Sequence, residues 1–381
     1  MAEPERPRWA RVAMMALGHG FSDFYATMFT PLVATFRAMF GLQLTGISLI
    51  GMSLGVFGSM LQPLFGLLGD RTDRGAMAAG GLAVSAVFIG CIGLAPNVVV
   101  LATLLGLGML GVAAFHPSGA VLALGRGVRG SLAMALFLTG GGVGLAATPL
   151  AVAEVVERWG LPWLWVLAVP GVALAVWVFA ATRKGTVPRP ARRQLDLRAL
   201  VGPGTGPVWA LFGMATLRAV PVTALAYFAS EVGVLRHWDL RTVGRVISLF
   251  MLAGVAGGLV GGFLAHRVGR RALLAGSTAL AAPCFFLYAA SHAWVSVAAL
   301  GLGQFTLTLG TPLNVSLAQE LQPQRASAVT GLMMGMAWGL ANVLLLAVGA
   351  LGEAIGLELA LQVVASISAL GAVLVVFVPA R

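Results

Sequence analysis

The chain has 381 residues, of which 59% are hydrophobic and only 10% are charged, and its formal net charge is +11 at pH 7. Because soluble domains carry about a quarter charged residues, this composition excludes an ordinary soluble protein and predicts an all-α polytopic membrane protein. Cys91 and Cys284 both lie in apolar runs, which argues against a disulfide framework and a cysteine-based metal site.

Twelve apolar runs follow one another along the chain, each long enough to cross the roughly 30 Å hydrocarbon core as a helix. They fall into two sets of six, at 12–36, 44–68, 75–95, 98–124, 131–153 and 161–181, and at 206–230, 242–264, 272–290, 294–319, 327–351 and 357–378. The first run is too long for a secretory signal peptide, so we expect a retained first helix.

A basic stretch at 182–205 separates the two sets, and its prolines prevent one continuous helix. We therefore predict two pseudo-symmetric six-helix bundles, 1–181 and 206–381, joined by a cytoplasmic linker. Eighteen of the 24 Lys and Arg residues fall on the side of the N-terminus and four on the opposite side. This asymmetry predicts an inner-membrane protein with both termini in the cytoplasm, and it explains the positive charge without a nucleic-acid partner.

Ionisable side chains inside a membrane are costly and mark functional positions. Asp23 lies about 18 Å along the first helix from Arg11, near the middle of the membrane. His19 precedes it by one helical turn on the same face, and an imidazole beside a carboxylate can titrate near neutral pH. We predict that His19 and Asp23 couple transport to protons, although His19 could instead make a structural bond between helices.

His116 lies in the fourth run, about 15 Å from the basic end at Arg126. Pro117 follows it and frees a backbone carbonyl, so we expect a kinked and hydrated region. His116 is therefore the third candidate for proton coupling. Arg218 reaches a similar depth in the seventh run and keeps its charge, so it is either a counter-charge to Asp23 or an anchor for an anionic substrate.

Polar residues at helical spacing mark the tenth run, where they face protein or water rather than lipid. These residues either bind substrate or form hydrogen bonds between helices. Together with Tyr25, they are further candidates for substrate binding: Gln304, Thr308, Thr311 and Asn314.

Two similar loops follow the second run of each set. The first copy contains Gly66, Asp70, Arg71, Asp73 and Arg74, and the second contains Gly262, His266, Arg267, Gly269, Arg270 and Arg271. An acid and arginines at a helix end can bridge neighbouring helix ends and hold one conformer, which makes these loops gate candidates. The alternative is that the arginines only enforce topology.

These duplicated loops resemble the loop motif of the major facilitator superfamily. The chain further resembles the fosmidomycin resistance branch of that superfamily in three segments: Gly18-His19-Gly20-Phe21-Ser22-Asp23-Phe24-Tyr25, Ala114-Phe115-His116-Pro117-Ser118 and Ala318-Gln319-Glu320-Leu321. The resemblance implies the twelve-helix fold, a central cavity lined by helices one, four and seven, and proton-driven drug efflux. The glycine-rich segment 140–144 is similar to the fifth helix of antiporters in the superfamily.

The leading hypothesis is proton-coupled efflux of a small drug-like or anionic molecule by alternating access. The alternative is proton-coupled uptake of a small metabolite or anion on the same fold. An intramembrane enzyme would need a nucleophile–base or metal cluster, which the scattered histidines do not supply, and a lipid flippase would need a lateral opening. We expect a monomer that needs no cofactor or metal, whose partners are its substrate, protons and the lipid bilayer.

Overall fold

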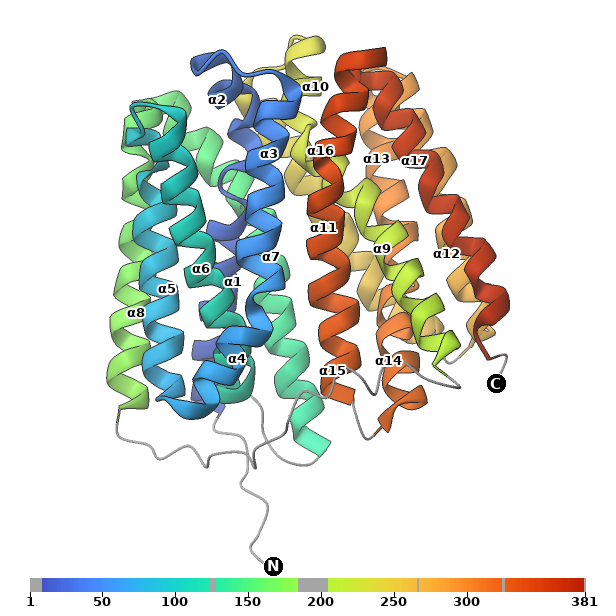
Figure 1. Ribbon diagram of the computed structural model, residues 1–381, viewed down its shortest axis with the longest axis horizontal. Helices are drawn as coiled ribbons and strands as arrows, with labels where there is room; N and C mark the ends of the chain where they lie inside the picture. Colours follow the sequence, from blue (N-terminus) through green and yellow to red (C-terminus); the bar gives the residue numbers. More distant parts are fainter. Residues whose placement is uncertain (1–8, 124–127, 184–204, 266, 324–325, 380–381) are drawn as a thin grey trace, which may run out of the picture. The chain divides into compact units, whose positions relative to one another are not determined.

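The computed structural model describes residues 9–123, 128–183, 205–265, 267–323 and 326–379. Over these residues the chain is helical and contains no strand (Figure 1). The prediction of an all-α fold is therefore confirmed. The predicted linker, apart from its first two residues and its last, lies outside the described residues.

The helices of the first half correspond to the first six apolar runs. They are α1 (Trp9–Thr27), η1 (Thr30–Leu32), α2 (Val33–Met39), α3 (Leu44–Gly55), the π-helical η2 (Val56–Met60), α4 (Gln62–Arg71), α5 (Arg74–Gly90), η3 (Cys91–Leu94), α6 (Val98–Ala123), α7 (Val128–Trp159), η4 (Leu161–Leu167) and α8 (Ala168–Thr182).

The second half contains the remaining helices. They are α9 (Gly206–Tyr227), α10 (Ala229–Leu235), α11 (Leu240–Leu264), α12 (Arg270–Ala290), α13 (Ala293–Thr308), α14 (Thr311–Leu321), α15 (Ala326–Gly331), the π-helical η7 (Leu332–Met336), α16 (Ala337–Ile355), α17 (Leu357–Val373) and η8 (Leu374–Phe377).

Among the described residues, eleven helical segments are long and apolar enough to cross a membrane, and they match the second to twelfth predicted runs. Helix α1 occupies the first run, but Arg11, His19 and Asp23 lower its hydropathy. The predicted run at 12–36 is also not one continuous helix. Helix α1 ends at Thr27, and the short helices η1 and α2 follow around Pro31, which has no N–H to continue the helical bonding.

Contacts divide the chain into two compact units, which we describe separately. Unit 1 comprises 1–32, 60–193 and 240–248, and unit 2 comprises 33–59, 194–239 and 249–381. Segment 33–59 thus belongs with unit 2, although it precedes the linker in sequence. The predicted boundaries of the two bundles stay a prediction.

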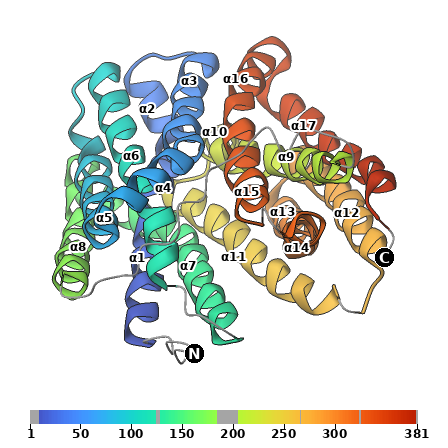
Figure 2. The same ribbon diagram turned by 60° about the horizontal axis from the view of Figure 1, so that its bottom comes forward.

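Small residues let helices of unit 1 approach closely. Helix α1 packs against α7, and α5 packs against α6 (Figure 2). A Cβ atom added to Gly140 or Gly144 of α7 would overlap the carbonyl oxygen of Ala16 or Gly20 of α1. The α1–α7 contact therefore depends on glycine, as is common between membrane helices.

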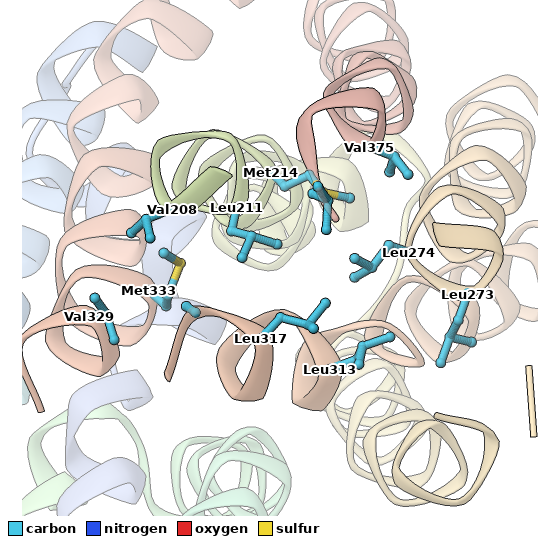
Figure 3. Close-up of a cluster of buried hydrophobic side chains, with 12 residues drawn as sticks. Val208, Leu211, Met214, Leu273, Leu274, Leu313, Leu317, Val329, Met333 and Val375 are labelled. Atoms are coloured by element: carbon cyan, nitrogen blue, oxygen red, sulfur yellow. The ribbon is translucent and has the colours of Figure 1, made fainter. Parts of the chain in front are cut away.

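Unit 2 has a core between α9, α12 and α14. Leu211 and Met214 of α9 face Leu274 of α12 and Leu317 of α14 in this cluster of buried side chains (Figure 3). Such contacts replace contacts with lipid, so their stabilisation comes from close packing rather than from removing apolar surface from water. This core fixes α12 and α14 beside α9, the helix that carries Arg218.

Candidate functional site

The three predicted coupling residues meet inside unit 1. His19 and Asp23 lie one turn apart on α1, with 3.4 Å between His19 Nε2 and Asp23 Oδ2. His116, on α6, places its Nε2 atom 2.9 Å from Asp23 Oδ1. The side chains of His19, Asp23 and His116 are 7%, 16% and 20% exposed. A carboxylate and two imidazoles therefore form one mostly buried cluster.

Backbone carbonyls fix the proton positions on both imidazole rings. His19 Nδ1 lies 2.8 Å from the carbonyl oxygen of Phe137, and His116 Nδ1 lies 2.8 Å from that of Val112. A carbonyl oxygen only accepts hydrogen bonds, so each Nδ1 atom must carry a proton and donate it. Both Nε2 atoms are then left facing the carboxylate.

The contact between His116 and Asp23 must hold one further proton. At 2.9 Å it is a hydrogen bond, and a hydrogen bond needs a donor. The proton resides either on Nε2, as an imidazolium, or on the carboxyl group. The ligand atoms of His19, Asp23 and His116 all lie within 4.8 Å of one another, so the same atoms could accept a proton or a small cation.

Helix α7 closes the cluster from one side. The Phe137 ring stacks on His19 with 4.1 Å between ring centroids, and a Cβ atom added to Gly141 would lie 2.5 Å from Asp23 Oδ2. Phe137 and Gly141 were not among the site residues predicted from sequence. They lie one helical turn apart, and Gly141 belongs to the glycine-rich segment 140–144, which is the signal that could have found them.

Tyr25 of α1 is fully buried, and its hydroxyl donates to the carbonyl oxygen of Leu167 at 2.8 Å. Its ring lies against Gly171 of α8. In this structure the side chain therefore fastens α1 to its neighbours, and its predicted contact with substrate stays a prediction.

Arg218 lies in unit 2, buried on α9 at 5% exposure. Its Nη2 atom donates to the hydroxyl oxygens of Ser277 and Thr278 and to the carbonyl oxygen of Leu274, and Nε also donates to Thr278. All these partners belong to α12. Asp23 belongs to the other unit, so a pairing of Arg218 with Asp23 stays a prediction.

The predicted polar stripe of the tenth run is interrupted. Helix α13 ends at Thr308 and α14 begins at Thr311, with Pro312 in its first turn. Thr308 bonds within its own helix, Asn314 donates to the carbonyl oxygen of Leu211, and Gln304 is buried. The four residues therefore do not form one continuous face, and their role in substrate binding stays a prediction.

In the first predicted gate loop, Asp73 accepts hydrogen bonds from the backbone N–H groups of Gly75 and Ala76 and so caps α5. Gly66 lies on α4, Arg71 is exposed, and Arg74 is buried at the start of α5. The side chain of Asp70 lies outside the described part of the chain.

In the second loop, Arg270 Nη1 donates to Glu320 at 2.7 Å, and Arg271 donates to the carbonyl oxygen of Val378. Arg270 thus links the start of α12 to the end of α14, as a bridge between helix ends would. Gly262 lies on α11, Arg267 is exposed, and Gly269 precedes α12, whereas His266 is not among the described residues.

Comparison with known proteins gives consistent matches over the whole chain. The model of the family described as Major Facilitator Superfamily matches residues 15–229 and 208–381. The chain is 25% identical over 368 residues to an uncharacterized MFS-type transporter, YfnC, of Bacillus subtilis strain 168, covering 94% of this chain and 90% of the relative. It is 24% identical over 400 residues to the fosmidomycin resistance protein of Escherichia coli strain K12, covering 98% and 94%.

Solved structures of transporters share the fold. A bacterial homolog of the human lysosomal transporter Spinster, in an inward-facing and occupied conformation, gives a TM-score of 0.78 at 14% identity, covering 98% of this chain and 97% of that one. A POT family transporter in complex with 5-aminolevulinic acid gives 0.73 at 12% identity, covering 97% and 96%.

Proposed function

Because the chain belongs to the major facilitator superfamily, a family of transporters and not of enzymes, we propose that it is a proton-coupled exporter of a small drug-like or anionic molecule. The observation that carries this proposal is the 2.9 Å contact between His116 Nε2 and Asp23 Oδ1, which requires a proton between them. It lies inside a bundle of membrane-spanning helices, where a titratable pair has no evident structural purpose.

The geometry of the pair supplies a way to couple protonation to conformation. If the shared proton leaves, the Nε2 lone pair of His116 and the carboxylate of Asp23 face each other at 2.9 Å without a donor between them. Two buried acceptors in this position repel each other and lose their hydrogen bond. Deprotonation therefore favours a conformer in which α1 and α6 separate these groups, and protonation favours the one observed here.

Export, rather than uptake, is supported by the likeness to a fosmidomycin resistance protein and by the glycine-rich contact of α7 with α1. Proton-coupled uptake would use the same fold. The proposal includes an inner-membrane location, cytoplasmic termini, a monomer built of two bundles, and the arginine loops as part of the cytoplasmic gate.

The decisive experiment measures proton movement driven by substrate. The purified protein is placed in liposomes that contain a pH-sensitive dye, and a gradient of fosmidomycin is imposed as the probe. We expect substrate-dependent proton flux with the natural protein and only background flux with Asp23→Asn. Oriented vesicles, right-side-out and inverted, distinguish export from uptake by the direction in which a proton gradient accumulates the probe.

The matched control is Glu154→Gln, an acid-to-amide change on α7 of the same unit at a half-exposed carboxylate that pairs with Arg241. This variant should keep its proton flux. If Asp23→Asn still accumulates the probe against its gradient at the natural rate, proton coupling through Asp23 is wrong. If a sodium gradient drives accumulation where a proton gradient does not, the coupling ion is misassigned.

A further inference from the structure

Arg218 is a buried cation with one nitrogen that bonds to nothing. Its Nε and Nη2 atoms are held by α12, whereas Nη1 is buried and has no hydrogen-bond partner. The hydroxyls that accept from Arg218 donate their own protons to the carbonyl oxygen of Leu274. Ser277 and Thr278 therefore hold the guanidinium in place without supplying any negative charge.

Among the residues that the structure describes, the bonds of Arg218 go to hydroxyl and carbonyl oxygens and not to an acid. Glu231 pairs with Arg37, Glu358 with Arg236 and Glu320 with Arg270. The side chain of Glu353 accepts from Thr45. An uncompensated charge within a membrane-spanning helix costs several kcal/mol, which makes it a candidate for binding a charged ligand.

A helix break lies directly beside the guanidinium. Gly310 separates α13 from α14, and a Cβ atom added to it would lie 2.6 Å from Arg218 Nη1 and would overlap Nη2. Helix α14 has 11 residues and begins at Thr311, so its first backbone N–H groups and the positive end of its dipole lie at the break. The charged guanidinium and the first N–H donors of α14 therefore lie beside each other at Gly310, inside unit 2.

We propose that Arg218 and the N-terminus of α14 together bind an oxyanion of the transported molecule: a carboxylate, phosphate or phosphonate group. Arg218 supplies charge and the free Nη1 donor, and the helix N-terminus supplies further N–H donors. Ser277 and Thr278 are positioning residues that orient the guanidinium. This inference rests on the proposed transport function and specifies its substrate class.

The depth of Arg218 places it out of reach of the headgroups of the surrounding bilayer. The residue lies about 18 Å along α9 from Gly206, whereas half of the hydrocarbon core is roughly 15 Å thick. Headgroup phosphates lie outside that core. The bound group therefore belongs to a solute that enters the transporter.

The test measures equilibrium binding to the purified protein in nanodiscs of neutral lipid, with no gradient present. Methylphosphonate and acetate are the probes, titrated by calorimetry against the natural protein and against Arg218→Gln and Arg218→Lys. We expect Arg218→Gln to weaken binding about 10- to 100-fold, since hydrogen bonds to charged groups are lost. Arg218→Lys should weaken binding about 10-fold, because lysine keeps the charge but not the forked donors.

Arg236→Lys is the matched control, because Arg236 is also buried in unit 2 but already has an acid partner in Glu358. It should bind both probes as the natural protein does. Binding of methylphosphonate alone would assign the site to tetrahedral oxyanions, and binding of both probes would assign it to oxyanions in general. If the natural protein binds neither probe at millimolar concentration, or if Arg218→Lys binds as tightly as the natural protein, the site is wrong.

The binding experiment on Arg218 and the transport experiment on Asp23 can fail independently of each other. Asp23→Asn should keep its oxyanion binding, because Asp23 lies in unit 1 and binding is measured without a proton gradient. Unchanged binding by the folded Arg218 variants, together with loss of proton flux in Asp23→Asn, would overturn this site alone. Normal coupled transport by Asp23→Asn would overturn the coupling role and leave the oxyanion site standing.

Discussion

The carboxylate of Asp23 faces two imidazoles, each of which can accept a further proton only at Nε2. Their Nδ1 atoms already carry protons, which they donate to backbone carbonyl oxygens. His116 forms a hydrogen bond with that carboxylate, whereas the 3.4 Å contact of His19 is an ion-pair contact only. The two histidines therefore have different parts in the proposed coupling. His116 shares the proton directly, and His19 adds a second acceptor beside the carboxylate that can receive the proton when Asp23 moves.

The first prediction concerns Gly141, which leaves room for this cluster. In Gly141→Ala the new Cβ would lie 2.5 Å from Asp23 Oδ2 and 2.6 Å from His19 Cε1, so Asp23 and His19 must move. We expect substrate-dependent proton flux to fall at least about 10-fold, because small displacements of reacting groups are costly. The overcrowding should also cost about 1–3 kcal/mol of stability, measured by thermal unfolding in detergent.

Gly80→Ala on α5 is the control, since an added Cβ there meets no atom within 4 Å. Alanine favours the helix by up to about 1 kcal/mol over glycine, so this variant should be as stable as the natural protein or slightly more stable. Full proton flux in Gly141→Ala would mean that the cluster can shift without losing its function, and that its geometry is not what couples transport.

Part of this cluster could be predicted from sequence. The spacing of His19 and Asp23 predicted their contact, because one helical turn fixes which side chains share a face. Depth along the helices predicted that His116 lies near the same level. The carbonyl oxygen of Phe137 and the position of Gly141 could not be predicted, because they depend on how α7 is rotated against α1. Likewise, the bonds from Arg218 to Ser277 and Thr278 depend on tertiary packing.

At the scale of the elements, hydropathy predicted where helices cross the membrane but not where they break. The run at 294–319 is apolar enough to cross a membrane as one span, yet it is two helices, α13 and α14, because Pro312 and Gly310 interrupt the bonding. A mean hydropathy averages side chains over the run and does not register the backbone N–H that is missing at Pro312. The same limit applies to η2 and η7, where π-helical segments interrupt otherwise continuous runs.

The second prediction tests how α1 is held by its neighbours. Tyr25→Phe removes the hydroxyl that donates to the carbonyl oxygen of Leu167 and leaves that carbonyl without this bond. We expect a loss of about 1 kcal/mol in the free energy of unfolding, because a buried acceptor loses its partner. Affinity for the transported molecule should change little, since the side chain is fully buried.

Tyr288→Phe is the corresponding control in unit 2, because the hydroxyl of Tyr288 is buried and has no hydrogen-bond partner. Removing it should leave stability unchanged or raise it slightly. A large loss of substrate affinity in Tyr25→Phe, with stability unchanged, would instead support our sequence-based prediction that Tyr25 binds substrate.

At the scale of the whole molecule, two membrane-spanning segments belong to both units. The span Leu44–Gly69 begins in unit 2 with α3 and ends in unit 1 with α4, and the π-helical segment Val56–Met60 lies where it changes unit. Helix α11 likewise changes unit near Ser248. Irregular turns within helices are frequent at hinges and functional sites, so any motion of one unit against the other would bend the span at this segment.

The third prediction tests whether transport requires α3 to leave α16, the helix it packs against in unit 2. A Cβ atom added to Gly349 would lie 3.0 Å from the Cβ of Ser48, slightly less than the 3.5 to 4.5 Å typical of a disulfide.

With Cys91 and Cys284 changed to serine, we expect Ser48→Cys and Gly349→Cys together to form a disulfide under mild oxidation. If the predicted bundle 1–181, which includes α3, moves as one body against the bundle 206–381, these helices must separate during alternating access. The oxidised protein should then lose at least about nine-tenths of its transport, and a thiol reductant should restore it. Each single cysteine variant should transport equally well before and after oxidation. If the double variant transports as fast with its disulfide formed as it does after treatment with thiol, α3 and α16 move as one body. The opening of this transporter then lies elsewhere.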